Sequence, residues 1–287
     1  MHKDFMALIN ANMKDFSKGQ RAIAKYIMEN YDKAAFMTAS RLGKAVDVSE
    51  STVVRFASQL GFGGYPGMQK AIQEMIRNKL TSIQRIEVTN DQIGDQDILT
   101  SVLQSDVDKI RTTLENVDKA AFNEAVDTLM SARRIFIMGV RSSATLAGFM
   151  GFYFNYLFDD VHVVQNDAGG EFFEQLMKVS DQDVIVAFSF PRYSSDTVKA
   201  VEFCRRKNVK VIVITDSGSS PLATKGDVVL YASSNMVSFV DSLVAPMSVV
   251  NAIIVAVSRK KGADVAQTFS QLEKIWEEYK VYEINDD

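Results

Sequence analysis

Cysteine and histidine are scarce in this sequence. Its 287 residues include one cysteine, Cys204, and two histidines. A single thiol excludes an internal disulfide framework, and so few cysteines and histidines provide no zinc-type ligand cluster. We therefore expect no disulfide, no metal site and no cofactor.

Long hydrophobic runs are also absent. The N-terminus carries Asp4 and has no apolar stretch of signal-peptide length, so nothing in it directs export. The most apolar stretch, 239–257, contains Asp241, Pro246 and Asn251. These residues leave apolar segments far shorter than the roughly 20 residues that a membrane-spanning helix needs. We expect a cytoplasmic protein that does not bind membranes.

Charge is distributed unevenly along the chain. Residues 1–80 hold 12 Lys and Arg against 7 Asp and Glu, a net charge of +5, whereas the remainder holds 20 against 29, a net charge of −9. A basic N-terminal part joined to an acidic body favours a polyanion as the partner of the first part. A chance excess of solvated lysines would give the same count.

Short amphipathic helices are predicted for the first part of the chain. Ser17 is placed to cap one of them. Two more, at 37–46 and 50–60, are separated by a short turn in which Ser49 can cap the second helix and Asp47 tolerates a left-handed conformation. This is the layout of a helix-turn-helix motif, although an ordinary helical hairpin has the same pattern.

The outer face of the 50–60 helix carries side chains that suit a DNA major groove. Ser51 and Thr52 lie near its start, and Arg55 follows one turn later. Serine and threonine contact bases or phosphates, and arginine favours guanine edges. We therefore expect these three side chains to read DNA, and we add Ser49, at the start of the helix, to the DNA-binding candidates.

Residues 48–62 resemble the recognition helix of the RpiR/MurR family of bacterial transcriptional regulators. The matching run reads VSESTVVRFASQLGF and is followed by Gly64-Tyr65. Ser17 to Asn30 is similar to that family's second helix, with Gly19 where an acidic residue is usual. The resemblance implies a DNA-binding domain and, beyond the reading residues, phosphate contacts by Tyr65 and Lys70.

The sequence pattern changes at two points after this domain. Residues 78–97 lose helical periodicity and gain Thr, Asn, Asp and Gly, so we interpret them as a linker between a domain at 1–77 and a domain at 98–287. Two amphipathic helices, 98–114 and 120–130, then precede an alternation of strands and helices.

Five short apolar strands are predicted in this alternation, at 135–140, 161–165, 184–189, 211–215 and 228–231. Short apolar strands separated by helices indicate a parallel sheet that is covered on both faces. The predicted fold is therefore an all-α helix-turn-helix bundle followed by a five-stranded, three-layer α/β/α domain. An apolar helix at 240–257 completes it.

Polar side chains follow the first and third predicted strands, at the carboxyl ends where parallel sheets bind ligands. The first strand ends at Gly139 and leads into a helix whose first backbone N–H groups should lack intrahelical partners, which is an arrangement that binds anions. Alternatively, Ser142 and Ser195 simply cap their helices. The residues that we expect to bind an anionic effector are Arg141, Ser142, Ser143, Ser189, Arg192, Ser194, Ser195 and Thr197.

Residues 120–260 resemble the sugar isomerase (SIS) domain, which follows the DNA-binding domain in RpiR/MurR regulators. The matching segments are RIFIMGV at 134–140, SSA at 142–144, VIVITD at 211–216 and SPLA at 220–223. The resemblance implies that the hydroxyls after strands one and three hold the phosphate of a phosphosugar. It also implies a homodimer or homotetramer.

Two departures from the SIS pattern concern the ligand. Arg141 stands where the family usually has glycine, and SFPRYSSDT at 189–197 replaces the usual S-x-S-G-x-T loop. A guanidinium grips phosphate or carboxylate in a bidentate manner. Arg141 and Arg192 could therefore replace the backbone contacts that the missing glycines permit, or the ligand is a different acid.

These patterns favour a ligand-responsive transcription factor that binds a double-stranded DNA operator. The alternative is an aldose-ketose isomerase, which needs a positioned base, for which His162, Glu171 and Glu174 are weak candidates. A dinucleotide-dependent enzyme is disfavoured because Arg141 and Ala144 stand where G-x-G-x-x-G needs glycine. We expect no catalytic residues.

Overall fold

The computed structural model describes residues 5–76, 80–86, 97–164, 171–235 and 239–282. The chain divides into two units, the first containing Met1–Ser101 and the second Val102–Asn235 with Asp241–Asp287. Most of the predicted linker, 87–96, lies outside the described residues. Leu80 belongs to the core of the first unit and 82–86 is helical, so local structure continues past residue 77.

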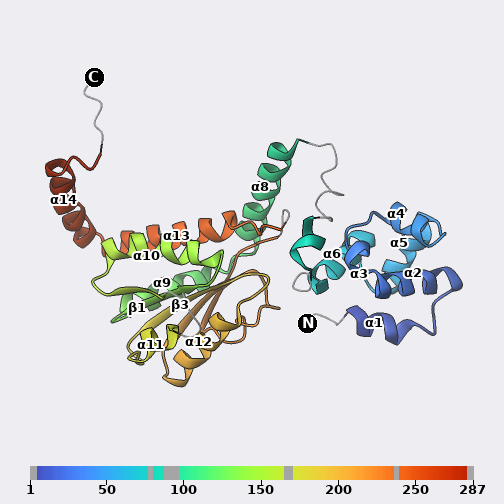
Figure 1. Ribbon diagram of the computed structural model, residues 1–287, viewed down its shortest axis with the longest axis horizontal. Helices are drawn as coiled ribbons and strands as arrows, with labels where there is room; N and C mark the ends of the chain where they lie inside the picture. The colour runs from blue at the N-terminus through green and yellow to red at the C-terminus, as the bar shows by residue number, and fades with distance from the viewer. Residues whose placement is uncertain (1–4, 77–79, 87–96, 165–170, 236–238, 283–287) are drawn as a thin grey trace. The chain divides into compact units, whose positions relative to one another are not determined.

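The first unit is helical throughout its described residues (Figure 1), with helices α1 (Phe5–Asn12), α2 (Lys18–Glu29), α3 (Tyr31–Ala34), α4 (Ala39–Ala45), α5 (Glu50–Gln59) and α6 (Tyr65–Ile76). The predicted cap at Ser17 is confirmed. Its side chain accepts from the Gln20 amide, and the Gln20 side chain accepts from the Ser17 amide, which is a capping box. Buried apolar residues on one side of each helix, such as Ile23, Leu42 and Phe56, form the core.

The turn between α4 and α5 has the geometry of a helix-turn-helix, as the sequence predicted. Asp47 adopts a φ of 54°. The Ser49 side chain accepts a hydrogen bond of 3.3 Å from the Thr52 amide and so caps α5. A Cβ at Gly43 would lie 2.7 Å from the Val48 carbonyl oxygen, so a side chain there would force the two helices apart.

The second unit contains the predicted parallel sheet. Its strands are β1 (Ile135–Gly139), β2 (Val161–Val164), β3 (Val184–Ser189), β4 (Lys210–Thr215) and β5 (Val228–Tyr231). They lie in the order β2-β1-β3-β4-β5, and every pair is parallel. Gln165, predicted as the end of the second strand, lies outside the described residues.

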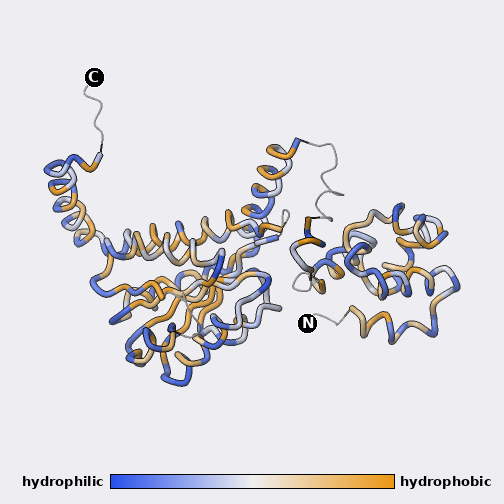
Figure 2. Tube along the Cα trace, in the orientation of Figure 1, coloured by the Kyte–Doolittle hydropathy of each residue, from blue (hydrophilic) through white to orange (hydrophobic). Residues whose placement is uncertain are grey.

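Helices cover both faces of this sheet (Figure 1), which makes the predicted three layers. One face packs against α9 (Lys119–Ser131), α10 (Ser143–Leu157) and α13 (Val244–Lys261), and the other against α11 (Phe172–Leu176) and α12 (Ser195–Arg206). Within β1, Ile135 and Ile137 enter the first core while Phe136 and Met138 enter the second. Strands buried on both faces are apolar throughout, as Figure 2 shows.

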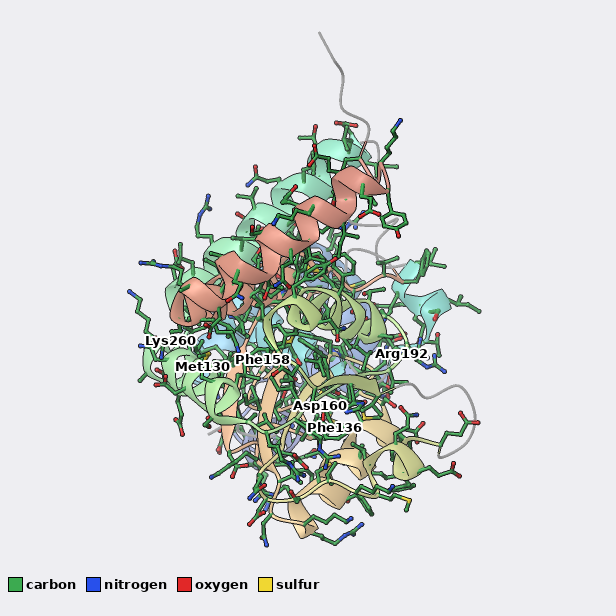
Figure 3. The ribbon with its side chains drawn as sticks, turned by 90° about the vertical axis from the view of Figure 1, so that its left-hand side faces the viewer. Met130, Phe136, Phe158, Asp160, Arg192 and Lys260 are labelled. Atoms are coloured by element: carbon green, nitrogen blue, oxygen red, sulfur yellow. The ribbon has the colours of Figure 1, made fainter. Side chains whose placement is uncertain are left out.

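The helices that flank this sheet domain differ in part from the prediction. Helix α8 (Ile98–Asn116) leads into it. Helix α13 begins at Val244 rather than at residue 240 and continues to Lys261, while α14 (Ala263–Glu278) was not predicted. Figure 3 shows Lys260 beside α9, where its ammonium group pairs with Asp127. No helix within the described ranges is long and apolar enough to cross a membrane.

Candidate functional site

Helix α5 exposes the polar side chains that the sequence singled out. Ser49, Ser51 and Arg55 are exposed and Thr52 is half-buried, while the opposite face of the helix is buried. The Ser49 hydroxyl lies 2.9 Å from the hydroxyls of both Ser51 and Thr52. The Arg55 Nε donates to the Ser51 carbonyl oxygen at 3.3 Å. The four side chains therefore form one polar surface at the start of the helix.

The two predicted phosphate contacts differ in their surroundings. Lys70 on α6 is exposed. Tyr65 is buried, its hydroxyl donates to the Met37 carbonyl oxygen at 2.6 Å, and burial raises the pKa of Tyr65 to about 12. We therefore correct its predicted role: Tyr65 packs in the core and fixes α6 against the segment before α4, because its only donor proton is already used.

The end of β1 brings α10 unusually close to the strand. A Cβ at Gly139 would lie 2.2 Å from the Ser143 carbonyl oxygen, so glycine is required there. Arg141, in the turn, has a φ of 57°, and Arg192, in the loop after β3, has a φ of 62°. This left-handed conformation costs a non-glycine residue about 1–2 kcal/mol. Both arginines thus retain a strained backbone conformation at the same sheet edge, and strain of this kind clusters at functional sites.

The amino end of α10 differs from the predicted anion-binding turn. The amides of residues 143, 144 and 145 donate to the carbonyl oxygens three residues earlier, at 3.2, 3.0 and 3.3 Å. The prediction that these amides lack partners was therefore wrong, because a tight turn uses them. Ser142 makes no side-chain cap hydrogen bond and is exposed, whereas Ser143 is buried. Anion binding here depends on the side chains of Arg141, Ser142 and Ser143.

The loop after β3 lies beside the loop after β1, because Gly139 pairs with Phe188 in the sheet. Ser189 and Thr197 are 2% and 1% exposed, and neither hydroxyl has a hydrogen-bond partner within the described part of the chain. A buried polar group left unsatisfied costs about 1–3 kcal/mol. These two hydroxyls therefore have the strongest tendency in this loop to bond to any polar group that reaches them.

The helix after this loop is capped by Ser194, whose side chain accepts from the Asp196 amide at 3.2 Å. The alternative that Ser195 is the cap was therefore wrong, and Ser195 is instead the exposed first residue of α12. Arg192 is also exposed.

The end of β4 holds the loop after β3 in place. The Thr215 hydroxyl donates to the Ser189 carbonyl oxygen at 2.5 Å, and the Tyr193 hydroxyl donates to Asp216 Oδ1 at 2.9 Å. Ser217 donates to the other oxygen of Asp216 at 3.1 Å. The Tyr193–Asp216 contact could not be predicted from the sequence, because the two residues lie on separate loops and no local pattern relates them.

The candidate bases of the isomerase alternative lie elsewhere or are exposed. His162 pairs with Phe136 in the register of β2 and β1, toward the amino ends of the strands. Its ring stacks on Phe136 at 4.9 Å, and its Nε2 lies 2.5 Å from Asp160. Glu171 and Glu174 are exposed. Over the residues that the structure covers, no group of three or more His, Cys, Asp or Glu side chains could hold a metal ion.

A helix-turn-helix unit with an exposed polar helix, joined to a parallel α/β domain with a hydroxyl-rich carboxyl edge, defines a DNA-binding protein with a ligand domain of the SIS type. The family model described as "Helix-turn-helix domain, rpiR family" matches residues 3–79, and the SIS domain model matches residues 128–256. Together they span more than half of the chain. The chain belongs to the RpiR family of transcriptional regulators, which confirms the predicted resemblance.

Named regulators resemble the chain over most of its length. The transcriptional regulator HexR of Escherichia coli is 28% identical over 220 residues, which cover 75% of this chain and 73% of HexR. An uncharacterized HTH-type transcriptional regulator of Caldanaerobacter subterraneus is 22% identical over 274 residues, 92% of this chain and 94% of that one.

Solved structures share the fold. The sugar isomerase domain of an RpiR transcription factor from Sphaerobacter thermophilus has a TM-score of 0.59 and 25% identity, and covers 62% of this chain and 99% of its own. The NanR protein of Vibrio vulnificus, complexed with ManNAc-6P, has a TM-score of 0.58 and 20% identity, and covers 95% of this chain and 98% of its own.

Proposed function

We propose that this regulator binds a double-stranded DNA operator through α5 and senses a phosphorylated sugar or related acid at the carboxyl edge of its sheet. The observation that carries the proposal is a pair of buried hydroxyls, Ser189 and Thr197, that have no hydrogen-bond partner among the described residues, at the sheet edge where Arg141 and Arg192 adopt a left-handed conformation. Hydroxyls and guanidinium groups are donors, so a ligand with several anionic oxygens suits them. NanR, which has the same fold, holds the phosphosugar ManNAc-6P.

A thermal-shift screen of phosphorylated sugars and sugar acids tests the ligand class. A ligand that binds only the folded protein at 100 times its dissociation constant stabilises the protein by about 2.7 kcal/mol. We expect one or more phosphorylated sugars to raise the melting temperature, while their unphosphorylated counterparts do not. Stabilisation by the neutral sugars alone would contradict an anion site.

Two hydrogen bonds connect the segment after β5 with α8, the first helix after the predicted linker, and a third joins that segment to the end of β4. The Ala232 amide, just after β5, donates to the Thr215 carbonyl oxygen at 2.8 Å. The next amide, of Ser233, donates to the Thr113 hydroxyl of α8 at 2.9 Å. Ser242 donates to Asp106 of α8 at 2.6 Å. These contacts support a route by which the ligand changes the position of α8.

Replacing Thr113 by valine should weaken the effector response without removing either binding function. Valine keeps the shape of threonine but leaves the Ser233 amide without its acceptor. One hydrogen bond changes an equilibrium constant by roughly two- to tenfold. We expect the effector-induced change in DNA affinity to fall by about threefold or more. Fluorescence anisotropy with labelled DNA, with and without effector, measures it.

The matched control for this prediction is Thr112→Val, because Thr112 is exposed on the same helix. It should respond to the effector like the wild type. If both variants respond like the wild type, the Thr113–Ser233 bond does not carry the signal.

Replacing Arg55 by alanine should reduce discrimination between operator and random DNA. A bidentate contact to a guanine contributes about 1–3 kcal/mol of discrimination, or roughly 5- to 150-fold. An operator selected by the wild-type protein from a random-sequence library provides the probe. Lys70→Ala serves as the contrast, because loss of one phosphate contact weakens binding to all sequences and lowers the salt slope by about one. Unchanged discrimination would remove Arg55 from the reading residues.

We also propose that the chain is not an enzyme. An isomerase needs a base within reach of the substrate, and His162 lies toward the other end of the strands while Glu171 is exposed. Turnover of a phosphorylated sugar that disappears in Glu171→Gln would establish the isomerase instead.

A further inference from the structure

Helix α14 has an apolar face that its own chain covers only in part. Val265, Phe269, Leu272, Trp276 and Tyr279 recur at helical spacing, yet none of the residues of α14 is buried. The first half packs on the body, where Phe269 lies 5.7 Å from the ring of Tyr156. In the second half, Ile275 is 49% exposed, and the ring of Trp276 lies 5.3 Å from that of Tyr282. A helix of this length is marginal in water by itself, so its second half needs a partner.

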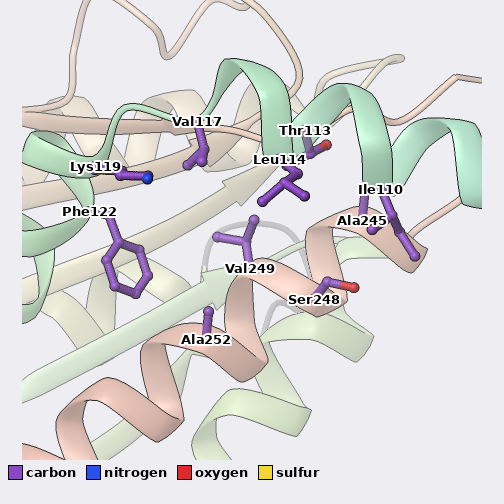
Figure 4. A pocket seen from close by; sticks show the side chains of 10 residues that line it. All are labelled: Ile110, Thr113, Leu114, Val117, Lys119, Phe122, Ala245, Ser248, Val249 and Ala252. Carbon is purple, nitrogen blue, oxygen red and sulfur yellow. The ribbon is translucent and has the colours of Figure 1, made fainter.

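An apolar groove lies between α8, α9 and α13 in the same unit (Figure 4). Its volume is about 300 Å³, and its lining includes Leu114, Val117, Phe122 and Val249. Leu114, on the wall formed by α8, is 71% exposed. The groove therefore offers the kind of surface that α14 requires.

The groove and α14 lie at opposite ends of α13. Ala245 and Ala252 of α13 line the groove, while α14 begins after the other end of α13, at Gly262. Figure 1 shows α8 and α14 on the same side of the sheet domain, at the two ends of α13. Between them α13 presents Val255, which is 57% exposed. The exposed second half of α13 therefore separates the groove from α14 along the helix.

We propose that the second half of α14 docks in this groove on a second copy of the chain. A two-fold axis across the middle of α13 would set two α13 helices antiparallel, so that each α14 arrives at the partner copy's groove. In such a symmetric interface each contact is made twice.

Charge supports this occupant. Of the ten residues that line the groove, Lys119 is the charged one. The second half of α14 carries Glu273, Glu277 and Glu278 against a single Lys274. An acidic helix that enters a groove with a lysine on its wall gains complementary charge at the edge of an apolar contact.

The fluorescence of Trp276, the one tryptophan of the sequence, can be used to follow this contact, because Trp276 lies on α14. We expect sedimentation of the full chain to show a dimer, with tryptophan emission that shifts to longer wavelength as dilution dissociates it. Leu114→Glu and Leu272→Glu should each raise the dimer dissociation constant at least about 100-fold, because each replaces an apolar side chain of the contact by a carboxylate that must lose its hydration. Met177→Glu, also 57% exposed but on a different surface, should leave it unchanged.

Mixing the two variants tests which surfaces meet. A Leu114→Glu chain has an intact α14, and a Leu272→Glu chain has an intact groove, so a mixture should recover dimers that neither variant forms alone. Four outcomes would each overturn the proposal. They are a wild-type protein that sediments as a monomer, a variant that dimerises like the wild type, a mixture that forms no dimers, and tryptophan emission that does not change with concentration. The experiment uses neither DNA nor effector, so it stands apart from the proposed function.

Discussion

Replacing Asp183 by alanine is expected to destabilise the protein by about 3 kcal/mol, since breaking a buried ion pair leaves its partners without a counter-charge. The Asp183 side chain is fully buried. Its Oδ2 accepts from Arg134 at 2.8 Å, from Arg133 at 3.0 Å and from the Ser180 amide at 2.8 Å. The carboxylate thus joins the start of β1 to the turn before β3. Alanine would leave the Ser180 amide without this acceptor and both guanidinium groups without their counter-charge, although Arg134 would still donate to the Lys178 carbonyl oxygen and Arg133 to the Ser180 hydroxyl.

The contribution of Asp183 should depend on pH. Burial raises the pKa of this carboxyl, but the hydrogen bonds from Arg134, Arg133 and the Ser180 amide outweigh burial and hold the pKa well below its usual range. A group whose pKa is lowered by folding stabilises the protein above its unfolded pKa, about 3.9, and loses that effect as pH falls below it. The stability difference between wild type and variant should therefore shrink on acidification from about pH 5 downward.

Urea denaturation of both proteins between neutral and acidic pH measures these effects. Asp181→Ala is the matched control, because Asp181 is an exposed carboxylate in the same turn, and surface substitutions usually change stability by about 0.5 kcal/mol or less. Equal losses in the two variants would mean that the arginine contacts of Asp183 add nothing to stability.

Replacing Arg141 by glycine is expected to raise stability by about 0.5–1 kcal/mol and to abolish the effector response. Glycine adopts the left-handed φ of 57° without the penalty of about 1–2 kcal/mol, although its freer unfolded chain offsets part of the gain. The guanidinium that would grip the anion is lost, and a charge-assisted hydrogen bond is worth about 1.5–3 kcal/mol. Effector affinity should therefore fall roughly 10- to 100-fold.

Arg141→Ala separates the two effects. Alanine also removes the guanidinium but keeps the left-handed strain, so it should lose the effector response without the gain in stability. Ligand-free DNA binding should stay intact in both variants. Thermal unfolding measures the stability, and effector titration measures the response. An effector response that persists in both variants would show that Arg141 does not bind the effector.

The sequence predicted the features that depend on neighbouring residues. The Ser17 cap, the left-handed Asp47 and the polar face of α5 follow from the preferences of single residues and from helical periodicity. Four of the five strands were predicted within one residue at each end, and the second within its described residues, because strands in a covered parallel sheet are mostly apolar. Helix α14 was not predicted, although Val265, Phe269 and Trp276 recur at helical spacing; none of its residues is buried, so it adds nothing to the core.

The candidate site was predicted less completely than the fold. The hydroxyls of Ser189 and Thr197 were expected at the sheet edge, but their burial depends on how α12 packs against β3. Tyr65 was predicted to contact DNA phosphate, but its side chain is buried in the core of the first unit and its hydroxyl donates to the Met37 carbonyl oxygen.

The sequence by itself determined the class of this protein: a helix-turn-helix head, an α/β body and a carboxyl edge with hydroxyls and two arginines. Those features are local, so short runs of residues encode them. The tertiary structure alone decided which hydroxyls are buried, that Asp183 binds two arginines, and that the segment after β5 is hydrogen-bonded to α8. Such contacts join residues far apart in the chain, and no local preference records them, because they form only when the whole domain packs.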